Sequence, residues 1–96
     1  MRNYEGVFIL NPELSGESAK SAIAQVQELV SKNGGRVDGL QEWGKRRLAY
    51  KIGKKQEGHY LVLSFQMDTQ QTKKLEQALR LNDQVLRFLL VNKDAL

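Results

Sequence analysis

The sequence predicts an α+β fold, a ferredoxin-like split βαβ sandwich with one four-stranded antiparallel sheet and two helices on one face. Three observations lead to it. Apolar residues alternate along four segments and recur at helical spacing along two others. The order is strand, helix, strand, strand, helix, strand. The 96 residues are 41% hydrophobic, so we expect one domain over residues 1–96. Right-handed crossovers place the strands in the spatial order fourth, first, third, second.

The first predicted strand covers residues 4–10 and is apolar on both alternating sets of positions, which is typical of a central strand. Pro12 ends it, because proline has no N–H to donate to a ladder. A helix then begins at Ser15 or Gly16, with Glu17 in its first turn, where a negative charge is favourable. Its apolar stripe consists of Ala19, Ala22, Ile23, Val26, Leu29 and Val30.

The run Asn33-Gly34-Gly35 predicts the end of that helix, because glycine and asparagine accept the left-handed conformation. Residues 36–52 then predict a long strand that is interrupted by bulges or bends at Gly39 and Gly44. A polar turn over residues 53–58 and a third strand over residues 58–67 follow. The inner face of that third strand is predicted to carry Leu61, Leu63, Phe65 and Met67.

The second helix is predicted to begin at a cap formed by Asp68 or Thr69. Its buried stripe would consist of Thr72, Leu75, Ala78 and Leu79. The pair Asn82-Asp83 ends the helix, and residues 85–91 form a last apolar strand. The whole chain is therefore accounted for by six elements, with no repeat and no linker.

Cations are concentrated in residues 43–56, which hold six of the chain's 15 lysines and arginines and no acid. Leu48, Tyr50 and Ile52 lie on one side of this strand. The other side and the residues leading into it carry Lys45, Arg46, Arg47 and Lys51. Guanidinium groups bind phosphate through paired donors, so the pattern favours a polyanion, in line with a net charge of +4. The alternative is an edge strand whose charges only prevent aggregation.

The sheet face away from the helices is predicted to be partly apolar. It would carry Val7, Ile9, Tyr60, Val62, Leu89 and Val91. An exposed apolar sheet face indicates a binding partner, whereas a few scattered apolar residues would need no explanation.

The sequence does not predict an enzyme, a cofactor or a metal site. It has no cysteine, its one histidine, His59, has no nucleophile or acid at motif spacing, and its carboxylates are dispersed. The turn after the first strand has no glycine-rich phosphate cradle. We see neither a signal peptide nor a membrane-spanning stretch, so we expect a cytoplasmic protein. Residues 58–65 share only a weak similarity with the third strand of RNA recognition motifs.

A closer resemblance rests on motifs spread over the whole chain in order. They are Met1-Arg2-Asn3-Tyr4-Glu5, Asn11-Pro12, Gly35-Arg36-Val37, Gly44-Lys45-Arg46-Arg47-Leu48-Ala49-Tyr50, Gly58-x-Tyr60 and Leu79-Arg80-Leu81-Asn82-Asp83-Gln84-Val85-Leu86-Arg87. Together they resemble bacterial ribosomal protein S six of the small subunit. The resemblance implies the ferredoxin-like fold and a structural role on the cytoplasmic ribosome. It also implies binding to the central domain of small-subunit ribosomal RNA, together with a neighbouring small basic ribosomal protein, number eighteen.

Two sets of residues follow from charge and resemblance together. The expected RNA-binding residues are Arg2, Lys45, Arg46, Arg47, Tyr50, Lys51 and Arg87. The expected partner-binding residues are the six apolar residues of the open sheet face. The alternatives are a small-ligand domain on the same fold, which would need a polar pocket, and a free-standing binder of single-stranded RNA.

Overall fold

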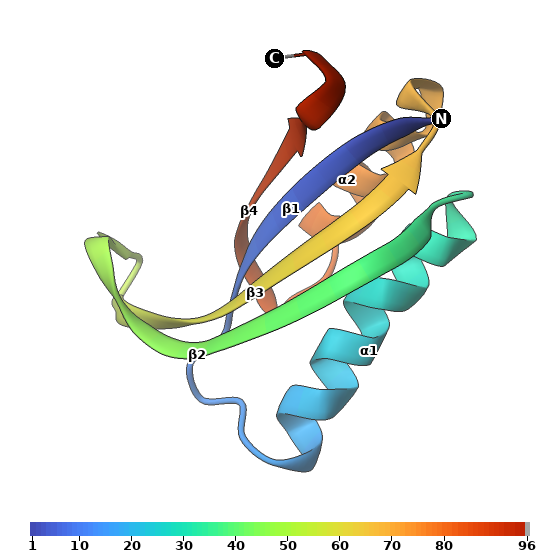
Figure 1. Ribbon diagram of the computed structural model, residues 1–96. Coiled ribbons are helices and arrows are strands. Elements are labelled where there is room, and N and C mark those ends of the chain that lie inside the picture. Colours follow the sequence, from blue (N-terminus) through green and yellow to red (C-terminus); the bar gives the residue numbers. More distant parts are fainter. Residues whose placement is uncertain (96) are drawn as a thin grey trace.

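The computed structural model describes residues 1–95, except for the side chain of Lys51, and its main feature is one four-stranded sheet (Figure 1). The strands are β1 (Arg2–Leu10), β2 (Arg36–Ile52), β3 (Lys55–Met67) and β4 (Val85–Asn92). They lie in the order β2-β3-β1-β4, and every neighbouring pair is antiparallel. The predicted fold class and strand order are therefore confirmed.

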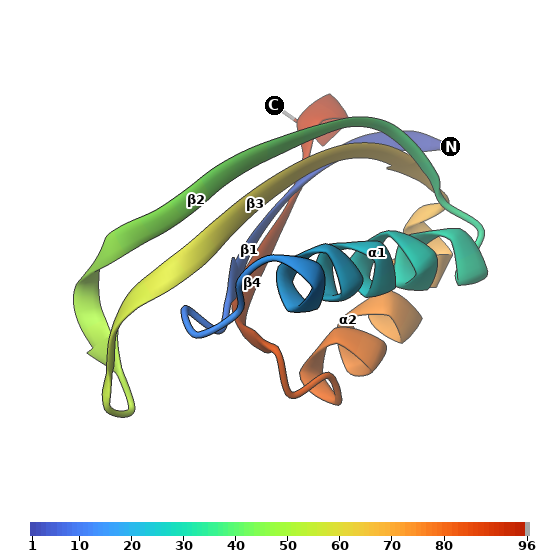
Figure 2. The same cartoon turned by 90° about the horizontal axis from the view of Figure 1, so that it is seen from below.

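Two helices, α1 (Glu17–Lys32) and α2 (Thr72–Arg80), lie together on one face of this sheet (Figure 2). Neither α-helix lies over the other face, which is called the open face below. A short 3₁₀ turn, Lys93–Ala95, follows β4. None of the helices in the described part of the chain is long and apolar enough to cross a membrane.

The core lies between the sheet and the helices. In β3 the alternation is as predicted, because every second side chain from Leu61 to Met67 is at most 1% exposed. The aromatic rings of Tyr4 and Phe65 stack with their centroids 5.6 Å apart. The rest of the buried cluster consists of Phe8, Leu10, Ala22, Ile23, Val26, Val30, Leu75 and Leu79.

The ends of α1 form where the sequence predicts them. Gly16 precedes the helix with a φ of 53°, in the left-handed region that glycine tolerates. At the other end, the side chain of Asn33 donates a hydrogen bond to the Leu29 carbonyl at 2.8 Å. Gly34 has a φ of 79°, and the N–H of Gly35 donates to the Val30 carbonyl at 2.9 Å. These bonds satisfy carbonyls that the last helical turn leaves without partners.

The start of α2 differs from the prediction. A 3₁₀ turn over Thr69–Gln71 comes first, and the α-helix begins only at Thr72. Asp68 stands at the predicted boundary, but its side chain makes no capping hydrogen bond. The buried stripe of α2 is led by Leu75 and Leu79, both 0% exposed.

The connection between β2 and β3 is shorter than predicted. β3 begins at Lys55, so only Gly53 and Lys54 separate the two strands, and the predicted polar turn over residues 53–58 is wrong in length. Gly53 has a φ of 61°, which suits a tight hairpin. The start of β3 was not predicted because residues 55–57 are polar. No helix covers either face of the hairpin there, so the strand needs no apolar side chains. Figure 2 shows the hairpin extending well beyond the helices.

Candidate nucleic-acid interface

The projecting β2–β3 hairpin holds most of the predicted cations in fixed register. Lys45 pairs with His59, Arg46 with Gly58 and Arg47 with Glu57. All three cationic side chains are exposed. The side chain of Lys51 lies outside the described residues. The hairpin therefore presents its positive charge to solvent at a distance from the helices. A ligand with many phosphates could reach several of these charges at once.

Neighbouring cations of the hairpin point to opposite sides. A Cβ placed on Gly58 would meet the Ile9 side chain, so the partner of Gly58, Arg46, lies on the open face of the sheet. The same Cβ would come within 3.4 Å of Leu48, which places Leu48 on that side too. Arg47 pairs with the next residue along β3 and therefore lies on the reverse side. The side chains of Arg46 and Arg47 therefore lie on opposite surfaces of the hairpin.

Arg87 joins the open face, whereas Arg2 lies apart. Arg87 pairs with Ile9, which in turn pairs with Tyr60, so one row crosses β4, β1 and β3. Arg2 pairs with Met67 at the end of the sheet opposite the hairpin (Figure 1). The structure therefore brings Arg46 and Arg87 to one face and does not bring Arg2 to them.

No acidic side chain lies within 4.0 Å of the predicted cations whose side chains the structure describes, which are Arg2, Lys45, Arg46, Arg47 and Arg87. Ion pairs within 4.0 Å involve Lys32, Arg36, Lys55, His59 and Arg80. None involves a cation predicted to bind RNA. A cation that has no acidic neighbour within the protein is available to pair with an external anion.

Two tyrosines of the prediction have different surroundings. Tyr50 is 66% exposed near the end of the hairpin. Tyr60 is half-buried on the open face and stacks with Trp43, with ring centroids 6.3 Å apart and planes 10° apart. Trp43, Tyr60 and Arg46 line a hollow of about 460 Å³.

Trp43 was not among the predicted site residues. It lies at a register shift, because Glu42 pairs with Leu61 and Gly44 with Tyr60, which leaves Trp43 as an extra residue. The only signal in the sequence was an aromatic residue followed by glycine in a strand. Such a bulge re-aims a side chain in a way that strict alternation does not predict.

The six apolar residues predicted on the open face do lie together there. Val7 pairs with Val62 on one side and with Leu89 on the other. Their exposures differ: Leu89 is 59% exposed, whereas Val62 is 7% exposed although no helix covers it. Strands on both sides enclose Val62, so Leu89 offers a partner more surface than Val62 does. Ile9, Tyr60 and Val91 are half-buried.

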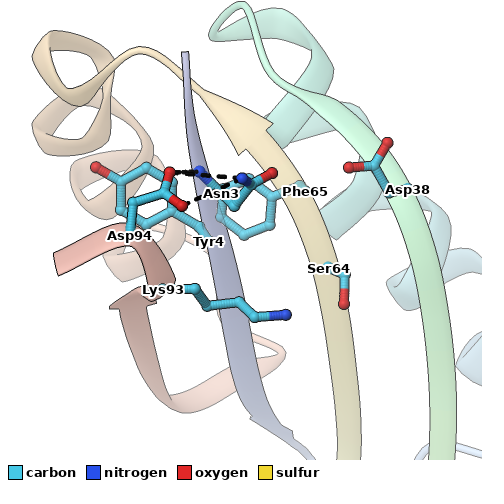
Figure 3. Close-up of a pocket in the computed structure, with 7 residues that line it drawn as sticks. All are labelled: Asn3, Tyr4, Asp38, Ser64, Phe65, Lys93 and Asp94. Carbon is cyan, nitrogen blue, oxygen red and sulfur yellow. Dashed lines mark hydrogen bonds between the residues drawn. The ribbon is translucent and has the colours of Figure 1, made fainter. Parts of the chain in front are cut away.

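The end of the open face away from the hairpin is polar (Figure 3). A hollow of about 340 Å³ is lined by Asn3, Tyr4, Asp38, Ser64, Phe65, Lys93 and Asp94. The backbone N–H of Asn3 donates to Asp94 Oδ2 at 2.8 Å, and its side-chain amide donates to Oδ1 at 3.3 Å. These bonds hold the 3₁₀ turn after β4 against the start of β1.

This contact predicts a pH dependence. The backbone N–H and then the side chain of Asn3 stabilise the charged form of Asp94, so the pKa of that carboxyl lies below its ordinary value of 3.8. A lowered pKa means that the stabilisation is complete above 3.8 and disappears as the pH falls through the lower value of the folded state. We expect the NMR shift of the Asn3 amide to change only in that acid range. An Asp94→Asn variant should remove the transition; a transition above the ordinary value would contradict the prediction.

His59 is the only histidine of the chain, and one carboxylate lies near it. His59 Nε2 lies 3.4 Å from Glu42 Oε1 but has no hydrogen bond of good geometry. No group of three or more histidines, aspartates or glutamates in the described chain could hold a metal ion. Among the acids of the sheet, Glu5 lies beside Val91 on the open face, whereas Glu42 pairs with Leu61 on the other side.

Comparison with known proteins gives a consistent result. The family model described as ribosomal protein S6 matches residues 3–92. The small ribosomal subunit protein bS6 of Clostridium novyi is 44% identical over 94 residues, which are 98% of this chain and 99% of that protein. The protein of the same name from Thermoanaerobacter pseudethanolicus is 43% identical over the same shares. A crystal structure of 30S ribosomal protein S6 from Thermotoga maritima superposes with a TM-score of 0.89 at 28% identity, covering 98% of this chain and 89% of the other.

Proposed function

Because this chain belongs to the ribosomal protein S6 family, we propose that it binds the central domain of small-subunit ribosomal RNA together with a neighbouring small ribosomal protein, number eighteen. Membership makes it a structural component of the small ribosomal subunit in the cytoplasm, and not an enzyme. The RNA, its domain and the protein partner are the parts that we propose.

One observation carries the RNA-binding part of the proposal. Lys45, Arg46 and Arg47 project from a hairpin that extends beyond the helices, with no ion pair among the described residues. Cations that only protected a sheet edge would not need a hairpin this long, or six cations and no acid within residues 43–56. Arginine and lysine that neutralise phosphates release bound counterions, which supplies a large, salt-dependent part of the affinity.

The open sheet face supports the protein partner. Leu89 is the most exposed of the six apolar residues predicted to bind a partner, and it stands beside Val7 and Val62. Glu5 pairs with Val91 in the adjacent row and adds an acid that a basic partner would accept. This part of the face, which carries Glu5 and lies on the side away from Arg87 and Arg46, fits a small basic protein better than it fits RNA, whose backbone is negative.

Sedimentation with ribosomes tests the proposal as a whole. The chain should remain with the small subunit through a high-salt wash, because a stable component makes protein and RNA contacts together. A free-standing binder of single-stranded RNA would be removed by salt. Reconstitution of the central-domain RNA with and without protein number eighteen then separates the two contacts. Loss of the chain from the small subunit in the salt wash contradicts the proposal.

The open face gives a residue-level prediction. Leu89→Asp should weaken binding to protein number eighteen by roughly tenfold or more, because it places a charge in a desolvated apolar contact. Leu81→Asp is the matched control, because Leu81 is 84% exposed at the end of α2 on the helix side. Isothermal titration calorimetry measures both affinities, and circular dichroism checks the fold. Equal affinities of the two variants would exclude this face as the docking surface.

A further inference from the structure

The bulge in β2 turns one aromatic side chain onto another. Trp43 is the extra residue between Glu42 and Gly44, and Gly44 has a φ of 74°, which residues with a Cβ rarely adopt. The left-handed glycine and the slipped register together place the Trp43 ring parallel to that of Tyr60. In a regular strand, where successive side chains alternate between the two faces, Glu42 and Gly44 would not pair with consecutive residues of β3.

Two hydrogen bonds hold Trp43 in place. Its indole Nε1–H donates to Gln41 Oε1 at 3.2 Å, and its carbonyl accepts a bond from Arg46 Nε at 3.2 Å. Trp43 nevertheless remains 48% exposed. Arg46 uses only Nε in this bond, so its two terminal nitrogens have no bonded partner among the described residues. The result is a fixed, open indole ring with a guanidinium beside it.

The charges around this pair favour an anionic ligand. On the open face the neighbouring positions are Gln41, Ile9, Arg87 and Arg46, and none of them is acidic. Glu42, which is next to Trp43 in sequence, pairs with Leu61 on the other side and approaches His59. A basic peptide would find no acid here, whereas a flat ring that carries a phosphate finds both an aromatic surface and cations.

We propose that Trp43, supported by Tyr60 and Arg46, is a stacking site for an unpaired RNA base, with Arg46 binding the phosphate of the same nucleotide. The proposal rests on the proposed function and adds to it a residue and a mode of contact. Stacking on aromatic side chains is independent of base identity, because every base has a π face. The hollow of about 460 Å³ is shallow and widely open to solvent, so the strand that carries the base can continue past it.

The assay uses the chain's own fluorescence. Trp43 is the only tryptophan, so its emission reports this site alone. The full chain is titrated with a single-stranded oligoadenylate and with an abasic oligomer of the same length and phosphate number. Stacking should quench Trp43 with oligoadenylate and leave it nearly unchanged with the abasic strand. Equal quenching by both strands, or by neither, overturns the proposal.

Variants make the same test without tryptophan emission. By anisotropy of a labelled oligoadenylate, Trp43→Phe should stay near the unmodified chain, whereas Trp43→Leu should bind roughly 5- to 150-fold more weakly. Arg46→Ala should weaken binding of both strands and make its salt dependence shallower. Lys20→Ala on α1 is the control and should change neither. Equal affinity of the phenylalanine and leucine variants would leave no role for the ring.

A last arm separates this inference from the function on which it rests. If protein number eighteen without RNA shifts the Trp43 emission to shorter wavelength, a protein covers the site and base stacking is wrong, while the ribosomal role stands. If the chain also fails to stay with the small subunit in high salt, the proposed function itself is wrong. Circular dichroism of each variant shows whether it is folded, and the abasic comparison needs no variant.

Discussion

Replacing Leu79 by alanine is expected to lower the free energy of unfolding by about 2–5 kcal/mol. Leu79 is 0% exposed and belongs to the buried cluster between α2 and the sheet. The cost has two parts, the lost transfer of the side chain from water and the cavity that it leaves. Leu75, one turn earlier and equally buried, should behave in the same way.

Urea denaturation followed by circular dichroism measures this effect. Leu81→Ala is the matched control: Leu81 is 84% exposed two residues further on, so its change should stay within about 0.5 kcal/mol. A change of only a few tenths at both Leu75 and Leu79 would mean that α2 does not cover the sheet as described. The same chemical change at positions two residues apart thus isolates burial as the cause.

Removing the guanidinium groups of Arg46 and Arg47 together is expected to weaken binding to the complex of RNA and protein number eighteen, and to make its salt dependence shallower. Each phosphate contact that is lost should reduce the slope of log affinity against log salt by about 0.7–0.9, because fewer counterions are released. The single variants should differ, since Arg46 lies on the open face and Arg47 on the reverse side opposite Glu57. The affinity of the double variant should then be close to that of the single variant that binds more weakly.

Filter binding or anisotropy over a range of salt concentrations supplies the slopes. Lys20→Ala serves again as the control, because it removes a charge from the helix side. A slope that does not change in a folded double variant would exclude the phosphate contacts. The cations would then act only to protect the edge of the sheet.

The sequence predicted the fold because burial leaves periodic signals. The alternation from Leu61 to Met67 and the helical stripe from Ala19 to Val30 are both present in the structure, since one face of each element is buried. The hairpin was less predictable. Residues 55–57 are polar and no helix lies over them, so no apolar pattern distinguishes strand from turn there.

The sequence predicted where the cations of the candidate site are concentrated, but it did not predict how the side chains of the site are arranged. The concentration of cations in residues 43–56 identified the hairpin. The side of the sheet on which each side chain lies could not be predicted, because the register shifts between Glu42 and Gly44 and between Arg47 and Ile52 break the strict alternation of β2. Trp43 was missed for this reason. The low exposure of Val62 was also missed, because it depends on side chains of neighbouring strands and not on its own position.

The order of synthesis sets a constraint on how this sheet can assemble. β1 is made first, yet it is an inner strand, and its partners are β3, which ends at Met67, and β4, which ends at Asn92. An apolar strand that includes Phe8 and Leu10 must therefore remain without a strand partner in the nascent chain until β3 has been made. The β2–β3 hairpin joins neighbours in sequence and can form earlier. Until β3 is complete, α1 is the core element already made against which the apolar side chains of β1 can be buried.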